Sequence, residues 1–207
     1  DRNLIWENIE DNMKLFNKWE TNFEVIDHGL KNYINLNPII IPRTGGRNVG
    51  TQFWKSKNNI VERLINKLMI PGHRGKKHRI SSGHNTGKSI TNYNIVIKTF
   101  QLIEERLKKN PVEVFVRAVE NAAPREEITT IEYGGARYSQ AVECAPQRRV
   151  DLALRNMVQG SYSQTFKSKR KMWECLADEI IKAFNSDNKS NSIARKLELE
   201  RQADASR

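Results

Sequence analysis

The chain has 207 residues, 38% of them hydrophobic and 29% charged, so it suits one domain with a modest core and a large polar surface. Its formal net charge of +11 favours a polyanionic partner such as nucleic acid. No apolar run approaches the roughly 20 residues that a membrane-spanning helix needs, and residues 1–10 lack the pattern of a secretory signal. We therefore expect a soluble cytoplasmic protein with no membrane partner.

The first 58 residues predict an extended N-terminal arm. Their helical periodicity is weak, and the stretch 37–50 contains two prolines and three glycines, which punctuate the chain. From residue 60 the pattern changes, because Ile60, Leu64 and Leu68 recur every four residues with polar side chains opposite. This stripe predicts an amphipathic helix that ends before Pro71. Similar stripes predict helices at 90–107 and 112–119.

A β-hairpin is predicted at about 128–144, where the sequence alternates around Gly134 and Gly135. Two consecutive glycines suit a two-residue turn of type I′, in which both positions have positive φ. In that register Ile131 lies opposite Tyr138, and Glu132 opposite Arg137. An isolated two-stranded hairpin is only marginally stable, so we expect this one to lean on helices or on a partner.

Helical patterning resumes at 150–158, at 172–184 and, more weakly, at 193–197. The fold class is therefore predicted as mainly α: a bundle of about six helices with one protruding β-hairpin and an extended N-terminal arm. We expect residues 1–58 to form the arm and residues 59–207 the helical domain.

The positive charge is concentrated in two blocks. Residues 43–79 carry ten Lys and Arg against Glu62 alone, and residues 137–171 carry eight against Glu143 and Asp151. Solvated protein surfaces usually interleave both signs, so this segregation favours a nucleic acid over a merely solvated basic face. Near the predicted start of the helix at 150, Arg148 and Arg155 are seven residues apart and share one helix face, which suits phosphate oxygens.

Two aromatic residues stand inside the first basic block. Phe53 and Trp54 neighbour Lys55 and Lys57 in a stretch without an apolar stripe. This arrangement fits stacking on a base while the lysines contact phosphates. An equal alternative is that the two rings anchor the arm to the core.

An enzymatic alternative rests on the stretch 83–89, which ends like a phosphate-binding loop with Lys88 and Ser89. The motif requires four residues between its glycines and a preceding buried strand; here there are three residues and a basic loop. What remains is a glycine-rich helix start with Lys88, a good place to hold any phosphate. We expect no catalysis and no cofactor.

No metal site is expected either. His73, His78 and His84 share one loop, but it holds no Cys and no acidic residue that could complete a zinc site, so phosphate or base contacts are favoured. Cys144 and Cys175 are far apart and outside any metal-binding spacing, and we expect buried free thiols.

The sequence closely resembles the family of small ribosomal subunit protein seven, in its archaeal and eukaryotic form. The matching motifs are "IVERLINKLM" (60–69), "NPVEVFVRAVENAAPREE" (110–127), "YGGARY" (133–138), "APQRRVDLALRN" (145–156), "CLADEIIKA" (175–183) and the ending "KLELERQADASR". The stretch 33–47 is similar to an extension that bacterial members lack, and "APQRR" leans archaeal. One departure is the loop 72–82, which is longer than the family pattern.

The resemblance implies a structural, non-enzymatic protein that binds the 3′ major domain of small-subunit rRNA and helps to nucleate the head. It also implies neighbouring head proteins, a place near the mRNA exit channel, and a hairpin near exit-site tRNA, with Gly134, Gly135, Arg137 and Tyr138 at its tip. The rRNA contacts that we expect are Arg43, Arg47, Lys55, Lys57, Arg63, Lys67, Arg74, Lys76, Lys77, Arg79, Lys88, Arg148, Arg149, Arg155, Lys167 and Lys169. The alternatives are a free RNA or DNA regulator and a nucleotide hydrolase using Lys88 and Ser89.

Overall fold

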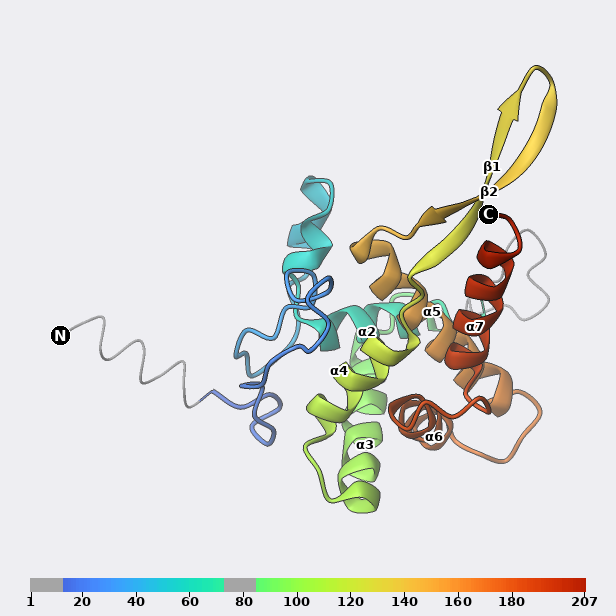
Figure 1. Cartoon of the computed structure of the whole chain (residues 1–207). Helices are drawn as coiled ribbons and strands as arrows, with labels where there is room; N and C mark the ends of the chain where they lie inside the picture. The colour runs from blue at the N-terminus through green and yellow to red at the C-terminus, as the bar shows by residue number, and fades with distance from the viewer. Residues whose placement is uncertain (1–12, 73–84) are drawn as a thin grey trace.

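The fold of the chain is given by a computed structural model that describes residues 13–72 and 85–207. In these residues it has six α-helices, two short 3-10 helices and one two-stranded antiparallel sheet (Figure 1). In chain order the elements are η1 (Arg47–Gly50), η2 (Trp54–Lys57), α2 (Ile60–Leu68), α3 (Ser89–Leu107), α4 (Pro111–Ala122), β1 (Glu126–Tyr133), β2 (Ala136–Glu143), α5 (Pro146–Thr165), α6 (Met172–Phe184) and α7 (Asn191–Asp204). The predicted mainly α fold is confirmed.

Local chemistry sets where the helices begin and end. The side chain of Asn59 accepts a hydrogen bond from the amide of Val61 at the start of α2, at 2.9 Å. At the start of α4, Asn110 caps the helix in the same way and Pro111 occupies the first helical position, where a missing N–H costs nothing. Helix α3 ends at Lys108, whose φ of 55° is left-handed and cannot continue a right-handed helix.

The core lies where α6 packs against α3, α4 and α5. Phe100 of α3, Phe115 of α4, Met157 of α5 and Ile180 of α6 are all fully buried there. These side chains come from the stripes predicted above, so one apolar face of each helix is removed from water. Helix α5 extends beyond its predicted stripe at both ends, from residue 146 to residue 165.

The described part of the arm packs into this same core. Leu15, Phe16 and Trp19 are buried, and the ring of Trp19 meets that of Phe100 edge to face, with centroids 5.6 Å apart. The indole Nε1 of Trp19 also donates a hydrogen bond of 3.0 Å to Glu104 of α3. The arm therefore follows an irregular path but is anchored by buried aromatic side chains.

The hairpin projects from the helical body, and α7 lies beside its base (Figure 1). Its register is the predicted one, with Ile131 opposite Tyr138 and Glu132 opposite Arg137. Gly134 and Gly135 have φ of 58° and 81°, as the predicted turn requires. Every residue from 131 to 140 is exposed, so the outer half of the hairpin stands largely in solvent.

Candidate nucleic-acid interface

The two basic blocks of the sequence meet where α2 packs against α5. Arg63 and Lys67 come from α2, Lys55 from η2, and Asp151 and Arg155 from α5. Lys55 and Arg63 pair with Asp151, and Lys67 interacts with Asp151, Lys55 and Arg155. We call these five residues the α2–α5 charge cluster. The cluster joins distant segments of the chain, because Arg63 and Asp151 are 88 residues apart in the sequence.

Asp151 neutralises only part of this cluster. Its carboxylate pairs with Arg63 at 3.0 Å and also with Lys55. Burial by itself would raise the pKa of Asp151, but the hydrogen bond from Lys55 and the charge of Arg63 outweigh burial, so the pKa lies below its ordinary value. The carboxylate is therefore fully ionised and already engaged by two cations.

Lys67 and Arg155 remain as surplus positive charge. Burial lowers the pKa of Lys67, and repulsion from Arg155 and Lys55 lowers it further, against the attraction of Asp151. Arg155 is exposed. Crowded like charges of this kind are relieved when an anion binds beside them, so this surface suits an RNA phosphate.

Arg63 has a different role from the one its basic block suggests. The residue is only 6% exposed, and besides Asp151 its guanidinium donates to the backbone oxygen of Tyr33 at 3.0 Å. These contacts tie the arm to α2 and α5. The side chain is engaged inside the protein, and the expected RNA contact is better assigned to its exposed neighbours.

Arg148 and Arg149 point in different directions although they are consecutive. Arg148 is exposed and forms a two-pronged bond with Glu127 of β1, at 2.6 and 2.7 Å, and this bond raises the pKa of Arg148. Arg149 is buried, bonds Asp27 at 2.7 Å and donates to the backbone oxygen of Pro124 at 3.1 Å. Only Arg148 could reach a phosphate without unfolding the site.

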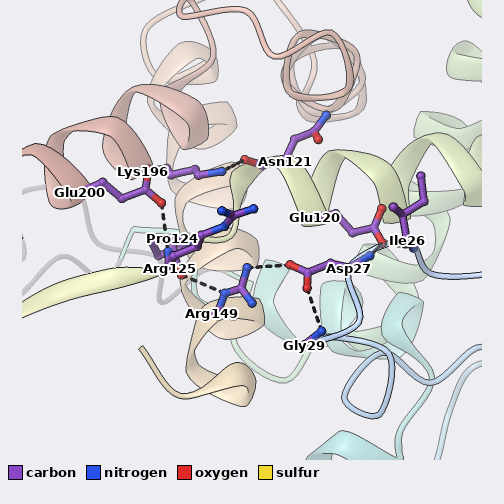
Figure 2. Close-up of polar contacts among 10 residues, drawn as sticks. All are labelled: Ile26, Asp27, Gly29, Glu120, Asn121, Pro124, Arg125, Arg149, Lys196 and Glu200. Carbon is purple, nitrogen blue, oxygen red and sulfur yellow. Dashed lines mark hydrogen bonds and ion pairs between the residues drawn. The ribbon is translucent and has the colours of Figure 1, made fainter. Parts of the chain in front are cut away.

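Figure 2 shows that Arg149 belongs to a set of polar contacts at the base of the hairpin. Glu120 of α4 accepts hydrogen bonds from the amides of Ile26 and Asp27, at 2.7 and 3.1 Å. Glu200 of α7 accepts from the amide of Arg125 at 3.0 Å, just before β1. The arm, α4, α5 and α7 thus jointly fix the direction in which the hairpin leaves the body.

The basic residues of the arm are exposed. Arg43, Arg47 and Lys57 all lie at the surface, and the ammonium of Lys57 sits 4.6 Å from the ring centroid of Trp54. Phe53 is 64% exposed and Trp54 43%, so neither ring anchors the arm to the core. The exposure counts against the core-anchor interpretation of this aromatic pair, and stacking on a base stays a prediction.

Three further predicted residues lie elsewhere on the surface. Lys88 is exposed at the start of α3, and Lys167 and Lys169 are exposed in the loop after α5. Since a helix rises about 1.5 Å per residue, Lys167 lies roughly 25–30 Å along α5 from Arg148. Lys167 and Lys169 therefore form a contact region separate from Arg148. Arg74, Lys76, Lys77 and Arg79, like His73, His78 and His84, lie outside the described residues.

The hairpin tip carries more than its four predicted residues. Arg137 lies 3.6 Å from Glu132 across the strands, and Tyr138 is 60% exposed. Tyr133, directly before the turn, is 81% exposed and was missed by the sequence reasoning. Its position beside the two glycines was the available signal, because a ring at the turn of a projecting hairpin has nothing to pack against.

Residues 13–72 and 85–207 contain no group of three His, Cys, Asp or Glu side chains placed to hold a metal ion. The same ranges include no helix with the length and apolarity needed to cross a membrane. Cys144 and Cys175 are free and buried, as predicted, and burial raises the pKa of the Cys144 thiol to about 11.

Comparison with known proteins gives a consistent result over nearly the whole chain. A family model described as "Ribosomal protein S7p/S5e" matches residues 31–207. The small ribosomal subunit protein uS7 of Nanoarchaeum equitans is 54% identical over 196 residues, which are 94% of this chain and 99% of that protein. The uS7 proteins of Methanococcoides burtonii and Archaeoglobus fulgidus are 48% and 43% identical, over 94% and 96% of this chain and 99% and 97% of theirs.

Proposed function

Because the chain belongs to the ribosomal protein S7p/S5e family, we propose that it is a structural component of the small ribosomal subunit that binds rRNA through its exposed cations. It is not an enzyme. One observation carries the RNA-binding role: the α2–α5 charge cluster retains Lys67 and Arg155 as positive charge that Asp151 does not neutralise.

The rRNA contacts fall into three regions on this proposal. The first consists of Lys55, Lys67, Arg148 and Arg155, near the junction of α2 and α5. The second is the arm with Arg43, Arg47 and Lys57, where exposed rings stand beside the cations. Lys88, directly before Ser89, also belongs to this second region, because Ser89 lines one pocket with Arg43. The third region is the α5–α6 loop with Lys167 and Lys169. Separated cationic regions suit a folded RNA whose phosphates approach from several sides.

The finer placement of the protein is also proposed. It binds the 3′ major domain of small-subunit rRNA in the cytoplasm, helps to nucleate the head beside other head proteins, and lies near the mRNA exit channel. The hairpin tip, with Gly134, Gly135, Arg137 and Tyr138, approaches exit-site tRNA. The exposure of the whole stretch 131–140 supports this role, because side chains that stand in solvent are available to touch a neighbour.

Salt dependence of RNA affinity tests the proposal. Filter binding would measure the affinity of the full chain for a fragment containing the 3′ major domain of small-subunit rRNA, at several salt concentrations. If six to ten phosphates are neutralised, affinity falls by about 10³ to 10⁵ between 50 and 200 mM salt. The double variant Lys67→Glu, Arg155→Glu should reduce the slope of log affinity against log salt by about one for each residue.

Lys189→Glu is the matched control. Lys189 is exposed in the turn between α6 and α7 and belongs to none of the three regions, so its reversal should leave the slope nearly unchanged. A flat salt response of the wild-type protein would contradict the proposal. Equal slopes for the double variant and the wild type would show that Lys67 and Arg155 do not contact the RNA. Co-sedimentation with small subunits distinguishes the ribosomal role from that of a free RNA regulator.

A further inference from the structure

A pocket of about 630 Å³ opens between the arm, α2 and the first turn of α3. Its size falls within the roughly 300–1,000 Å³ that is typical of small-molecule sites. Ile65 and Met69 of α2 and Tyr93 of α3 line it with apolar surface, and Glu62 of α2 also contributes to the wall. None of the contact regions proposed above makes use of this pocket, apart from Arg43 at its rim.

Glu62 is unusual among the residues of the pocket. It is 4% exposed, and its Oε1 accepts hydrogen bonds from the amide and the hydroxyl of Thr44, at 2.9 and 2.6 Å. Its Oε2 is buried and has no hydrogen-bond partner among the described residues. A buried carboxylate oxygen without a donor is unfavourable, so an N–H group that entered the pocket and reached Oε2 would be stabilised there.

The opposite wall of the pocket favours negative charge. Ser89 and Ile90 belong to the first turn of α3 and line the pocket, and no side chain caps this 19-residue helix at Lys88. The amide of Ser89 donates to the backbone oxygen of Gly87 at 3.0 Å, but the next amides at such a helix start have no partner within the helix and attract anions. Arg43 also lines the pocket and is exposed. The pocket therefore offers a hydrogen-bond acceptor on one side and an anion site on another.

We propose that this pocket binds one unpaired guanine nucleotide of RNA, with the base donating to Glu62 Oε2 and the phosphate beside Arg43 and the start of α3. The inference rests on the proposed RNA-binding function and adds a base-specific contact to it. An unpaired base can enter such a pocket because RNA-binding proteins commonly recognise splayed-out bases through their Watson–Crick edges.

Guanine fits better than the other bases for a chemical reason. Its Watson–Crick edge carries two adjacent donors, N1–H and the N2 amino group. In adenine, cytosine and uracil every donor on that edge adjoins an acceptor, which a carboxylate oxygen would repel. A Lys or Arg side chain of a neighbouring protein could also donate to Glu62, but Arg43 and the positive end of α3 oppose a cation there.

Short RNAs test this proposal directly. Fluorescence anisotropy would measure the affinity of the full chain for labelled UUUGUUU, UUUAUUU, UUUCUUU and a uridine heptamer. The guanine heptamer should bind about ten- to a hundredfold more tightly than the uridine heptamer. Glu62→Gln should abolish this preference without weakening binding of the uridine heptamer, because the amide can still accept from Thr44 but turns a donor toward the base.

Two further variants complete the design. Asn66→Trp places a large ring on an exposed position of α2 that lines the pocket, and should block guanine without disturbing the core. Asn66→Trp still tests the site if a thermal melt shows that Glu62→Gln is not folded at the temperature of the binding assay. Glu105→Gln, at an exposed position near the end of α3, is the matched control and should retain the full preference.

The outcomes separate the pocket from the general RNA-binding role. Equal affinities for all four heptamers would overturn the guanine site and leave RNA binding intact. A preference that survives Asn66→Trp would also overturn it, since guanine would then bind elsewhere. In another outcome the heptamers show no guanine preference, while a short arginine peptide binds the wild-type chain and not Glu62→Gln. That result would assign the pocket to a neighbouring protein and overturn the guanine site. If no heptamer and no rRNA fragment binds, the proposed function itself fails.

Discussion

Arg149 of α5 and Asp27 of the arm are 122 residues apart in the sequence and form an ion pair of 2.7 Å. The Arg149 side chain retains 10% exposure and that of Asp27 27%, so the pair is largely shielded from water. Because Arg149 also donates to the backbone oxygen of Pro124, it joins the arm to the segment that leads into the hairpin (Figure 2). The pair is therefore expected to stabilise the fold.

Removing this guanidinium should destabilise the protein strongly. Arg149→Ala leaves the carboxylate of Asp27 and the oxygen of Pro124 without their donor, and the free energy of unfolding should fall by about 3 kcal/mol. Arg155→Ala is the control on the same helix and should change it by less than about 0.5 kcal/mol, because Arg155 is exposed. Urea denaturation measures both. Equal effects would show that the Asp27 pair does not stabilise the fold.

The free energy of unfolding should decline in acid because three aspartates have pKa values below the ordinary one. Burial by itself would raise the pKa of Asp27, Asp151 and Asp178, but hydrogen bonds and charges from Arg149, from Lys55 and Arg63, and from Arg170 and Arg106 hold each pKa below the ordinary value of 3.8. A group of this kind contributes stability that is fully present above its unfolded pKa and is lost as pH falls through its folded pKa.

The free energy of unfolding should therefore be nearly constant between about pH 5 and pH 7 and fall below about pH 4. Urea denaturation at a series of pH values measures this curve. Asp27→Asn should be less stable than wild type at neutral pH and should show a shallower acid decline. A wild-type curve that rises below pH 4 would contradict the assignment of these three groups.

The backbone at Phe53 predicts a separation of stability from RNA affinity. Its φ of 67° is unfavourable for a bulky residue by about 1–2 kcal/mol, and its exposed ring gains little from packing. Phe53→Gly should keep or raise the melting temperature, whereas rRNA affinity should fall about five- to a hundredfold through the loss of stacking. Phe53→Asn tolerates the same backbone and should behave alike. A lower melting temperature in both would mean that the ring supports the fold.

Gly160 of α5 marks a close approach to α7. A Cβ atom added at this position would lie 2.6 Å from the Cβ of Asn191, so Gly160→Ala must push the two helices apart. Although alanine favours a helix, the clash should dominate and lower the free energy of unfolding by about 1–3 kcal/mol. Gly50→Ala, where a Cβ atom meets nothing within 4 Å, should have little effect. Thermal unfolding of the two variants makes the comparison.

Much of the fold follows from patterns that are local in the chain. The stripe of Ile60, Leu64 and Leu68 predicts α2 because residues four apart share one helix face. Gly134 and Gly135 set both the turn and the register of the hairpin. The arm was less predictable, since its anchoring depends on buried rings such as Trp19 that meet partners far along the chain and follow no period.

The sequence alone also determined that positive charge is segregated into two blocks, because counting charges needs no coordinates. Only the tertiary structure decided which of those cations are free to meet an RNA. Arg148 and Arg149 illustrate the reason: consecutive helix residues point about 100° apart, so one faces solvent and the other faces Asp27. Ion pairing acts through space between residues such as Arg63 and Asp151, and the chain brings them together only when it folds.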